Sequence, residues 1–322
     1  MHDAGGPSGT ANSINKFLER IFPLLSPMGV ALGVLLPGLF IHLRPIIPWL
    51  FGTITLSGAL KLRVRELGRA ASSPLPIIFY FLYAHVVIPL LIFLLSTLIF
   101  KNDPDSVTGF VLLYSVPTAV TAFIWISIFR GDSALSLALI LLDAILAPLV
   151  IPATVRLLLG TSVHLDMTAM AFSLFFMIVI PTILGVVLNE LSRGKIPAAA
   201  DPWLSPFSKV CMVMMIASNS ASVAPQIRPN DPHFWIIALV CIGFIIMNFI
   251  SARLMGIAGK FGREKQVSLF FASGLRNTSA AMTLGTEFFP AAAALPPILG
   301  IMLQQITAGI FGRILLRGKK DD

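Results

Sequence analysis

Long apolar segments follow one another along almost the whole chain, separated only by short connections that carry charge, proline or glycine. A helix needs roughly 20 apolar residues to cross the hydrocarbon core of a bilayer, which is about 30 Å thick. Segments of this kind lie at 21–42, 45–60, 74–99, 107–129, 133–159, 166–189, 204–224, 233–257, 266–288 and 293–316. They leave little of the 322 residues for a water-soluble core. The sequence therefore predicts an all-α polytopic membrane protein of about ten transmembrane helices, without a soluble domain.

The composition agrees with this prediction. Charged residues make up only 12% of the chain, whereas globular proteins contain about 25%. Cys211 and Cys241 each lie inside an apolar segment, which favours buried thiols over a disulfide or a metal site. Residues 1–15 are small and polar, and no clear cleavage site follows the first apolar segment. We expect a disordered cytoplasmic tail at 1–15, no signal peptide, and a second short tail at 318–322.

The distribution of lysine and arginine predicts the orientation. If the N-terminus is cytoplasmic, 18 of the 23 Lys and Arg residues fall on the cytoplasmic side and four on the outer side, with Arg276 inside a span. Such a bias is the positive-inside signature of membrane proteins. It predicts an even number of spans in the inner (cytoplasmic) membrane, with both termini cytoplasmic. It also accounts for the net charge of +8 without a nucleic-acid partner.

Two charged residues, Asp143 and Arg276, lie well inside predicted spans. Charged side chains are costly there and are functional candidates by default. One interpretation is that the two pair with each other or with polar neighbours and only fix helix packing. The other is a binding or coupling site. In that case Asp143 would carry a proton, because burial favours its neutral form, and Arg276 would hold an anionic substrate or replace a bound cation.

Two predicted spans contain a break. The polar segment Ser273–Ser279 interrupts the ninth span, and Pro117 interrupts the fourth, where it removes a helical hydrogen bond. The fourth and ninth spans occupy the same place in two sets of five. Paired broken helices indicate a transporter with inverted repeats and a binding site at the breaks. We therefore predict a first repeat at 16–160 and a second at 161–317.

Other residues carry weaker signals. A lone histidine in the third span, His85, is more typical of packing than of function. Gln304 and Gln305 in the tenth span suit either interhelical hydrogen bonding or substrate contact. Gly29 and Gly33 form a GxxxG pattern, which is typical of close helix packing. The sequence contains no GxxxxGK[ST], HExxH or GxSxG motif and no cluster of metal ligands, so we expect no enzyme, no cofactor and no metal site.

Several short motifs occur in an order and spacing that together are specific. They are Phe51–Gly52, Leu56–Leu62, Ile88–Pro89, Pro117, Arg130–Asp132, Ala134–Ser136, Leu146–Leu149, Pro152 and Gly274–Asn277. On these motifs, the chain resembles the bile acid:sodium symporter family over nearly its whole length. The resemblance implies two inverted five-helix repeats, a core domain in which broken helices 4 and 9 cross at mid-membrane, and a panel domain that moves against it. It also implies alternating-access transport of small organic anions, often driven by sodium.

The candidate residues for substrate binding and coupling surround the predicted crossing. They are His85, Thr118, Thr121, Ser136, Asp143, Ser273, Arg276, Asn277, Thr278, Gln304 and Gln305.

The chain departs from the family pattern where sodium would bind. Ser136 matches a sodium-ligand serine. The positions of the other side-chain ligands read Ala84, Ala122, Phe123, Ile140, Ala272 and Arg276. A hard cation prefers oxygen ligands, and nearly all of these are missing. The hypothesis is that Arg276 replaces sodium electrostatically, so that the carrier is proton-coupled through Asp143, a uniporter or an exchanger.

Three other functions remain open at this point. An arsenite-type efflux permease would share the architecture and would fit Phe123, Trp125 and Gly131–Asp132. However, Thr118 and Ala280 stand where that permease has a cysteine and a glutamate. A membrane sensor would bind a ligand without moving it, and measured translocation separates the two. An intramembrane enzyme is the third alternative, and substrate turnover would identify it.

Overall fold

The computed structural model describes residues 15, 17–18, 21–64, 68, 74–160 and 166–316. The two predicted tails lie outside the described residues, apart from Asn15. The described residues form helices, with no strand among them. Among these residues, seven helical stretches are long and apolar enough to cross a membrane: Pro37–Ala59, Pro74–Ile99, Ser133–Leu159, Met167–Leu191, Lys195–Gln226, Pro232–Ala258 and Ala291–Leu316. This confirms the all-α polytopic prediction, whereas the total of ten spans stays a prediction.

Two boundaries differ from those expected. Helix α2 (Phe22–Leu35) ends well before residue 42, because Pro37 disfavours the helical conformation at Leu36, which has φ −126° and ψ 50°. Residues after Pro37 therefore begin the next helical stretch, which includes α4 (Ile47–Ala59). Helix α13 (Lys195–Val223) starts nine residues earlier than expected. Its first turns are less apolar than its middle, so hydropathy alone did not include them.

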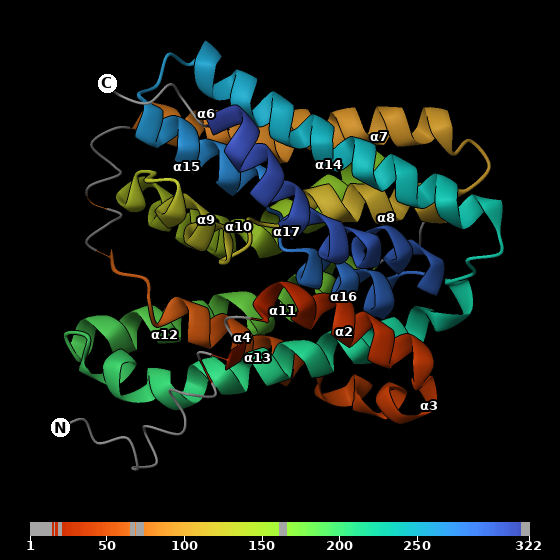
Figure 1. Ribbon diagram of the computed structural model, residues 1–322, viewed down its shortest axis with the longest axis horizontal. Helices are drawn as coiled ribbons and strands as arrows, with labels where there is room; N and C mark the ends of the chain where they lie inside the picture. Colours follow the sequence, from red (N-terminus) through yellow and green to blue (C-terminus); the bar gives the residue numbers. More distant parts are fainter. Residues whose placement is uncertain are drawn as a thin grey trace. The chain divides into compact units, whose positions relative to one another are not determined.

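The described residues form two compact units, and each unit takes helices from both halves of the chain. The predicted repeats concern internal similarity rather than compactness and stay a prediction. Unit 1 comprises 1–64 and 173–224. Within it, α13 packs along α2 and α4, and α12 (Ile180–Leu191) packs against α4 (Figure 1). A Cβ atom added to Gly33 would lie only 2.2 Å from the Ala217 carbonyl oxygen, so the predicted close packing at the GxxxG pattern is confirmed.

Unit 2 comprises 65–172 and 225–322. Its helices are α6 (Pro74–Leu82), α7 (Ile88–Ile99), α8 (Pro104–Ser115), α9 (Ala122–Ile128), α10 (Ser133–Leu159), α14 (Pro232–Ala258), α15 (Arg263–Gly274), α16 (Thr278–Phe288) and α17 (Leu295–Leu316). Helix α11 (Met167–Leu174) spans the boundary in the sequence between the two units. Helix α8 packs against α7, α10, α16 and α17, which buries nearly all of its residues.

Both predicted breaks exist in unit 2, and they meet. The chain leaves the helical conformation between α8 and α9, and again between α15 and α16. The two breaks run antiparallel at Thr118 and Arg276. Asn277 donates its backbone N–H to the Pro117 carbonyl at 2.8 Å, and Ala119 donates to the Leu275 carbonyl at 2.9 Å. The breaks thus satisfy each other's backbone groups, which apolar surroundings require.

Candidate functional site

Arg276 projects from the second break into the interior of unit 2, and its side chain is only 2% exposed. Its Nη2 donates to the backbone carbonyls of Tyr114 at 3.3 Å and Ala84 at 3.4 Å. Its Nη1 lies 3.5 Å from the Tyr80 hydroxyl. The Nε atom has no hydrogen-bond partner among the described residues. The buried Arg276 guanidinium is therefore held mainly by main-chain carbonyls, and its Nε–H remains an unused hydrogen-bond donor.

Asp143 of α10 is 1% exposed and accepts three hydrogen bonds. They come from the Tyr80 hydroxyl, from the Thr118 backbone N–H at 2.7 Å, and from His85 Nε2 at 2.7 Å. In the part of the chain that the structure describes, no direct ion pair joins Asp143 to Arg276. Instead, the Tyr80 hydroxyl contacts both. The two charges belong to one network, linked through a neutral group.

His85 belongs to the π-helical turn η2 (Tyr83–Val87), which joins α6 to α7. Its ring stacks on Phe81 with a centroid distance of 5.5 Å. Its Nδ1 atom is buried and lacks a hydrogen-bond partner among the described residues. Single π-helical turns inside α-helices often mark functional sites. His85, for which the sequence favoured a packing role, thus contacts the buried Asp143 carboxylate directly.

Three further candidates lie at the crossing of the breaks. Gln304 of α17 donates through Nε2 to the Arg276 carbonyl at 3.0 Å. Thr118 Oγ1 donates to the Leu275 carbonyl at 3.2 Å. Asn277 caps α16, because its Oδ1 accepts from the Ala280 N–H at 3.2 Å. These side chains hold the backbone of the breaks in place.

The remaining candidates fall into two groups. Ser273 and Thr278 flank the second break and are buried, and the Ser273 hydroxyl has no hydrogen-bond partner within the described ranges. Gln305 belongs to a separate cluster, in which its Oε1 accepts from Trp125 Nε1 at 2.8 Å and its Nε2 donates to Thr121 Oγ1 at 3.2 Å. Ser136 donates to the Asp132 carbonyl of its own helix start at 2.7 Å.

Comparison with known proteins identifies the protein's relatives. Residues 48–228 match the Sodium Bile acid symporter family. The chain belongs to this family. It is 39% identical to the protein YbaS of Bacillus subtilis (strain 168), over 92% of this chain and 96% of YbaS. As a family member with several membrane-spanning helices, it is a multi-pass membrane transporter.

More distant relatives carry functional names. The chain is 25% identical to the probable sodium/metabolite cotransporter BASS3, chloroplastic, of Oryza sativa subsp. japonica, over 79% of this chain and 60% of that protein. It therefore spans less than two thirds of that relative. It is 22% identical to the sodium-dependent transporter YocS of Bacillus subtilis (strain 168), over 88% of this chain and 87% of YocS.

The electrostatics of the site in this symporter-family protein follow from the helix breaks. Helix α8 ends at Ser115, so the Tyr114 carbonyl belongs to its last turn. The C-terminal end of a helix carries partial negative charge because its last carbonyls lack helical partners. Unwound carbonyls and half-helix C-terminal ends coordinate cations in transporters with broken helices. In this protein the Arg276 guanidinium occupies such a position.

Sequence reasoning missed the tyrosines. The chain contains 24 phenylalanines but only three tyrosines, and all three lie at or beside this cluster. Tyr80 links Asp143 to Arg276, Tyr114 provides a carbonyl to Arg276, and Tyr83 precedes Ala84, which provides the other. The scarcity of tyrosine in such an apolar chain was a signal that could have identified them.

Proposed function

We propose that this family member is a secondary transporter that moves a small organic anion by alternating access without bound sodium. The Arg276 guanidinium takes over the electrostatic role of the cation. The observation that carries the proposal is the burial of Arg276 on the carbonyls of Ala84 and Tyr114, at the crossing of the two helix breaks. Membership of a transporter family favours transport over the sensor and enzyme alternatives.

The surroundings of the proposed cation position support this substitution. Four residues that stand where the family has sodium ligands have apolar side chains and are buried. They are Ala84, Ala122, Ile140 and Ala272. Without side-chain oxygens, these positions offer a hard cation little beyond main-chain carbonyls. A guanidinium is a permanent charge with several N–H donors, and Arg276 already binds the Ala84 carbonyl and the neighbouring Tyr114 carbonyl.

The substrate class follows from the groups that remain unused. Arg276 Nε and the Ser273 hydroxyl are buried donors without a hydrogen-bond partner in the described part of the chain. Leaving buried donors unsatisfied is costly, so a ligand that accepts from them would be stabilised. A guanidinium matches carboxylate and similar anions well. The names of relatives such as BASS3 agree with a metabolite as cargo.

Alternating access needs two parts that move, and the chain forms two compact units. We assign unit 2, which contains the crossing, as the core domain and unit 1 as the panel domain. The whole chain would then have ten transmembrane helices in two inverted repeats. The repeats would be 16–160 and 161–317, in the inner membrane with both termini cytoplasmic. Proton coupling through Asp143, uniport and exchange are the three modes that dispense with sodium.

The first test is the thermal stability of the purified protein with lactate, gluconate, cholate or taurocholate, in sodium and in sodium-free potassium buffer. A ligand present at 100 times its Kd stabilises the folded state by about 2.7 kcal/mol. We expect at least one anion to raise the Tm equally in both buffers. That anion is then measured for uptake into proteoliposomes.

Arg276→Gln should lose the stabilisation by the anion, while Arg276→Lys should keep part of it because the charge remains. Ser127→Ala is the matched control, since its hydroxyl donates to a carbonyl of its own helix on an exposed surface. Stabilisation that requires sodium, or that persists in Arg276→Gln, would contradict the proposal. Binding without uptake would instead identify a sensor.

A further inference from the structure

The network around Asp143 has a simple charge balance. Tyr80 and Arg276 interact with the Asp143 carboxylate together with His85. Three more titratable groups lie around Arg276 and Tyr114 rather than against the carboxylate: Tyr83, Tyr114 and Cys241 of α14. Tyrosine and cysteine are ordinarily neutral at pH 7. With His85 neutral, Asp143 and Arg276 cancel, and the net charge is zero. A monovalent anion entering this site would leave an uncompensated buried negative charge, which is costly.

We propose that His85 and Asp143 together form the proton-binding site of the transporter, and that one proton enters with each monovalent anion. This inference rests on the proposed function and specifies its coupling. One bound proton gives the cluster a charge of +1, and one monovalent anion returns it to zero. The loaded and the empty carrier then carry the same charge in this cluster, so transport is electroneutral.

The hydrogen bonds identify the atom that receives the proton. An ionised carboxylate can only accept hydrogen bonds, so the contact of 2.7 Å between His85 Nε2 and Asp143 Oδ1 requires the hydrogen on Nε2. In neutral His85 the Nδ1 atom then carries the lone pair. This atom is buried and has no hydrogen-bond partner among the described residues. Binding a proton there converts the ring to imidazolium and breaks no existing hydrogen bond.

The same contacts connect the proton site to the substrate site. Asp143 Oδ2 accepts from the Thr118 N–H in the first break, and the Tyr80 hydroxyl links the carboxylate to Arg276. The positive charge of protonated His85 compensates the negative charge of Asp143, because opposite charges in a poorly solvated site interact strongly. The Arg276 charge is then less compensated and attracts an anion more strongly. Proton and anion thus favour each other's binding, as symport requires.

The test uses proteoliposomes that contain a pH indicator, with taurocholate as the monovalent probe if it stabilises the protein. With potassium and valinomycin clamping the potential at zero, an acidic exterior should drive accumulation about tenfold per pH unit, since one unit is a factor of ten in proton activity. Changing the clamped potential should leave accumulation unchanged. Anion uptake without internal acidification would overturn the proton site and leave the proposed function intact. Absence of uptake for every anion would overturn the proposed function itself.

His85→Gln is the decisive variant, because its amide can still donate to Asp143 but cannot bind a proton at neutral pH. Because the charge of the bound proton is then missing, we expect weaker anion binding and a loss of the accumulation driven by the pH gradient. Its Tm reports on folding independently. His42→Gln changes an exposed histidine in unit 1 and should behave as the wild type. Accumulation that responds to the pH gradient in His85→Gln as in the wild type would refute the assignment of the proton to His85.

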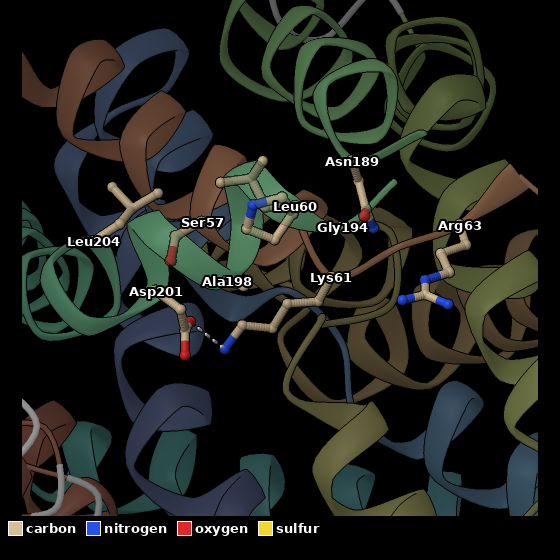
Figure 2. A pocket seen from close by; sticks show the side chains of 10 residues that line it. Ser57, Leu60, Lys61, Arg63, Asn189, Gly194, Ala198, Asp201 and Leu204 are labelled. Carbon is tan, nitrogen blue, oxygen red and sulfur yellow. Dashed lines mark ion pairs between the residues drawn. The ribbon is translucent and has the colours of Figure 1, made fainter. Parts of the chain in front are cut away.

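A different observation concerns a pocket of about 370 Å³ within unit 1. Figure 2 shows its lining, which comes from the end of α4, the segment after it, the end of α12 and the start of α13. Lys61 reaches toward Asp201, with Nζ 3.1 Å from Oδ1. Arg63 lies apart from that pair and is exposed. Its guanidinium has no hydrogen bond or ion pair with any residue that the structure describes.

The segment that carries both cations is held in place. Asn189 donates through Nδ2 to the Leu62 carbonyl at 2.8 Å, and the Val64 N–H donates to Glu190 Oε1 at 2.7 Å. The positively charged end of α4 is predicted to face the cytoplasm. Trp203, only two residues beyond Asp201, is 54% exposed, and tryptophan is enriched where membranes meet water. The pocket therefore has the charge and the predicted depth of a lipid headgroup site.

We infer that this pocket binds the phosphodiester headgroup of an anionic glycerophospholipid, with Arg63 as the principal cation and Lys61 shared with Asp201. Basic pockets between helices on the cytoplasmic side of membrane proteins bind such headgroups, and a guanidinium matches phosphate geometry. Pockets of roughly 300 Å³ and above accommodate small ligands. Asp201 competes with the phosphate for Lys61. Lipid binding should therefore weaken when the Arg63 charge is removed and strengthen when the Asp201 charge is removed.

The test is the Tm of the detergent-purified protein titrated with phosphatidylglycerol, compared with phosphatidylcholine. Arg63→Gln should weaken the phosphatidylglycerol effect roughly fivefold in apparent Kd, while Asp201→Asn should strengthen it by releasing Lys61. Arg156→Gln, an exposed arginine of unit 2, serves as control. No preference for phosphatidylglycerol, or an Arg63→Gln variant that responds like the wild type, overturns the inference. An equal response to glycerol 3-phosphate would identify a soluble phosphate ester and overturn the lipid assignment.

Discussion

The backbones of Thr118 and Arg276 lie opposite each other in an antiparallel bridge that joins the two helix breaks of unit 2. Main-chain hydrogen bonds on either side of the bridge hold the breaks together. The crossing is therefore held mainly by its own main-chain hydrogen bonds, with one further bond from the Thr118 N–H to Asp143 Oδ2. Substituting the charged side chains that surround it should change the charge of the site and its stability, while the two breaks stay paired.

The coupling between Arg276 and Asp143 can be measured with a double-mutant cycle. Arg276→Gln removes the positive charge that compensates the buried Asp143 carboxylate. Breaking a direct buried ion pair costs about 3–5 kcal/mol, and the loss here should be smaller because the Tyr80 hydroxyl lies between the two charges. Adding Asp143→Asn should recover part of that loss, because the second charge is removed too. The measurement is the free energy of unfolding in detergent for the two single variants and the double variant. Strictly additive losses would show that the charges do not interact through Tyr80.

The tyrosine hydroxyls allow a matched comparison. Tyr80→Phe removes a group that contacts both Asp143 and Arg276, and a hydrogen bond to a charged group contributes about 1.5–3 kcal/mol. The Tyr114 hydroxyl is buried but has no hydrogen-bond partner in the described part of the chain. Tyr114→Phe should therefore leave the Tm close to that of the wild type, and Tyr80→Phe should lower it. Equal effects of the two variants would contradict the bridging role of Tyr80.

The packing of α2 on α13 predicts a difference between two glycines. A Cβ atom at position 33 would clash with the Ala217 carbonyl oxygen, whereas at position 38 nothing lies within 4 Å. Overpacking of a close contact costs about 1–3 kcal/mol. Gly33→Ala should lower the free energy of unfolding by this amount, while Gly38→Ala should be neutral or slightly stabilising. A neutral Gly33→Ala would show that the two helices can separate without cost.

Asp103, which precedes α8, should make stability depend on pH. Burial raises the pKa of its carboxyl, but hydrogen bonds from Ser106 and His233 outweigh this and hold the pKa below its ordinary value. A depressed carboxyl pKa stabilises the folded state above the ordinary pKa of about 3.9, and this stabilisation disappears as the pH falls through the folded-state pKa. Asp103→Asn should thus be less stable than the wild type at pH 7. The difference in Tm between the wild type and Asp103→Asn should shrink as the pH falls below about 4. A difference that stays constant across pH would refute this role of the Asp103 carboxylate.

The sequence predicted the membrane class and both breaks because these depend on local properties. Runs of apolar residues determine the spans, and proline or glycine among polar residues determines a break, as at Pro117 and Gly274. Arg276 and Asp143 were recognisable because a charge inside an apolar run is conspicuous. The start of α13 was misplaced because its first turns are not apolar enough to resemble a membrane segment.

The partners of these charges could not be predicted in the same way. Tyr80 and His85 lie on α6 and the π-helical turn after it, far along the chain from Arg276, and only the packing of α6, α8 and α10 brings them together. A π-helical turn leaves no clear sequence pattern, so the direction of the His85 side chain was unknown. The strongest contacts of Arg276 are backbone carbonyls, which every residue has.

The gathering of all three tyrosines at one site has a practical consequence. Fluorotyrosine incorporated throughout the protein would place its labels at positions 80, 83 and 114 alone. The fluorine NMR spectrum would then consist of three signals that report only on this cluster, with no background from the rest of the chain. Changes in occupancy and conformation could be followed in the unmodified sequence, without engineering a single cysteine.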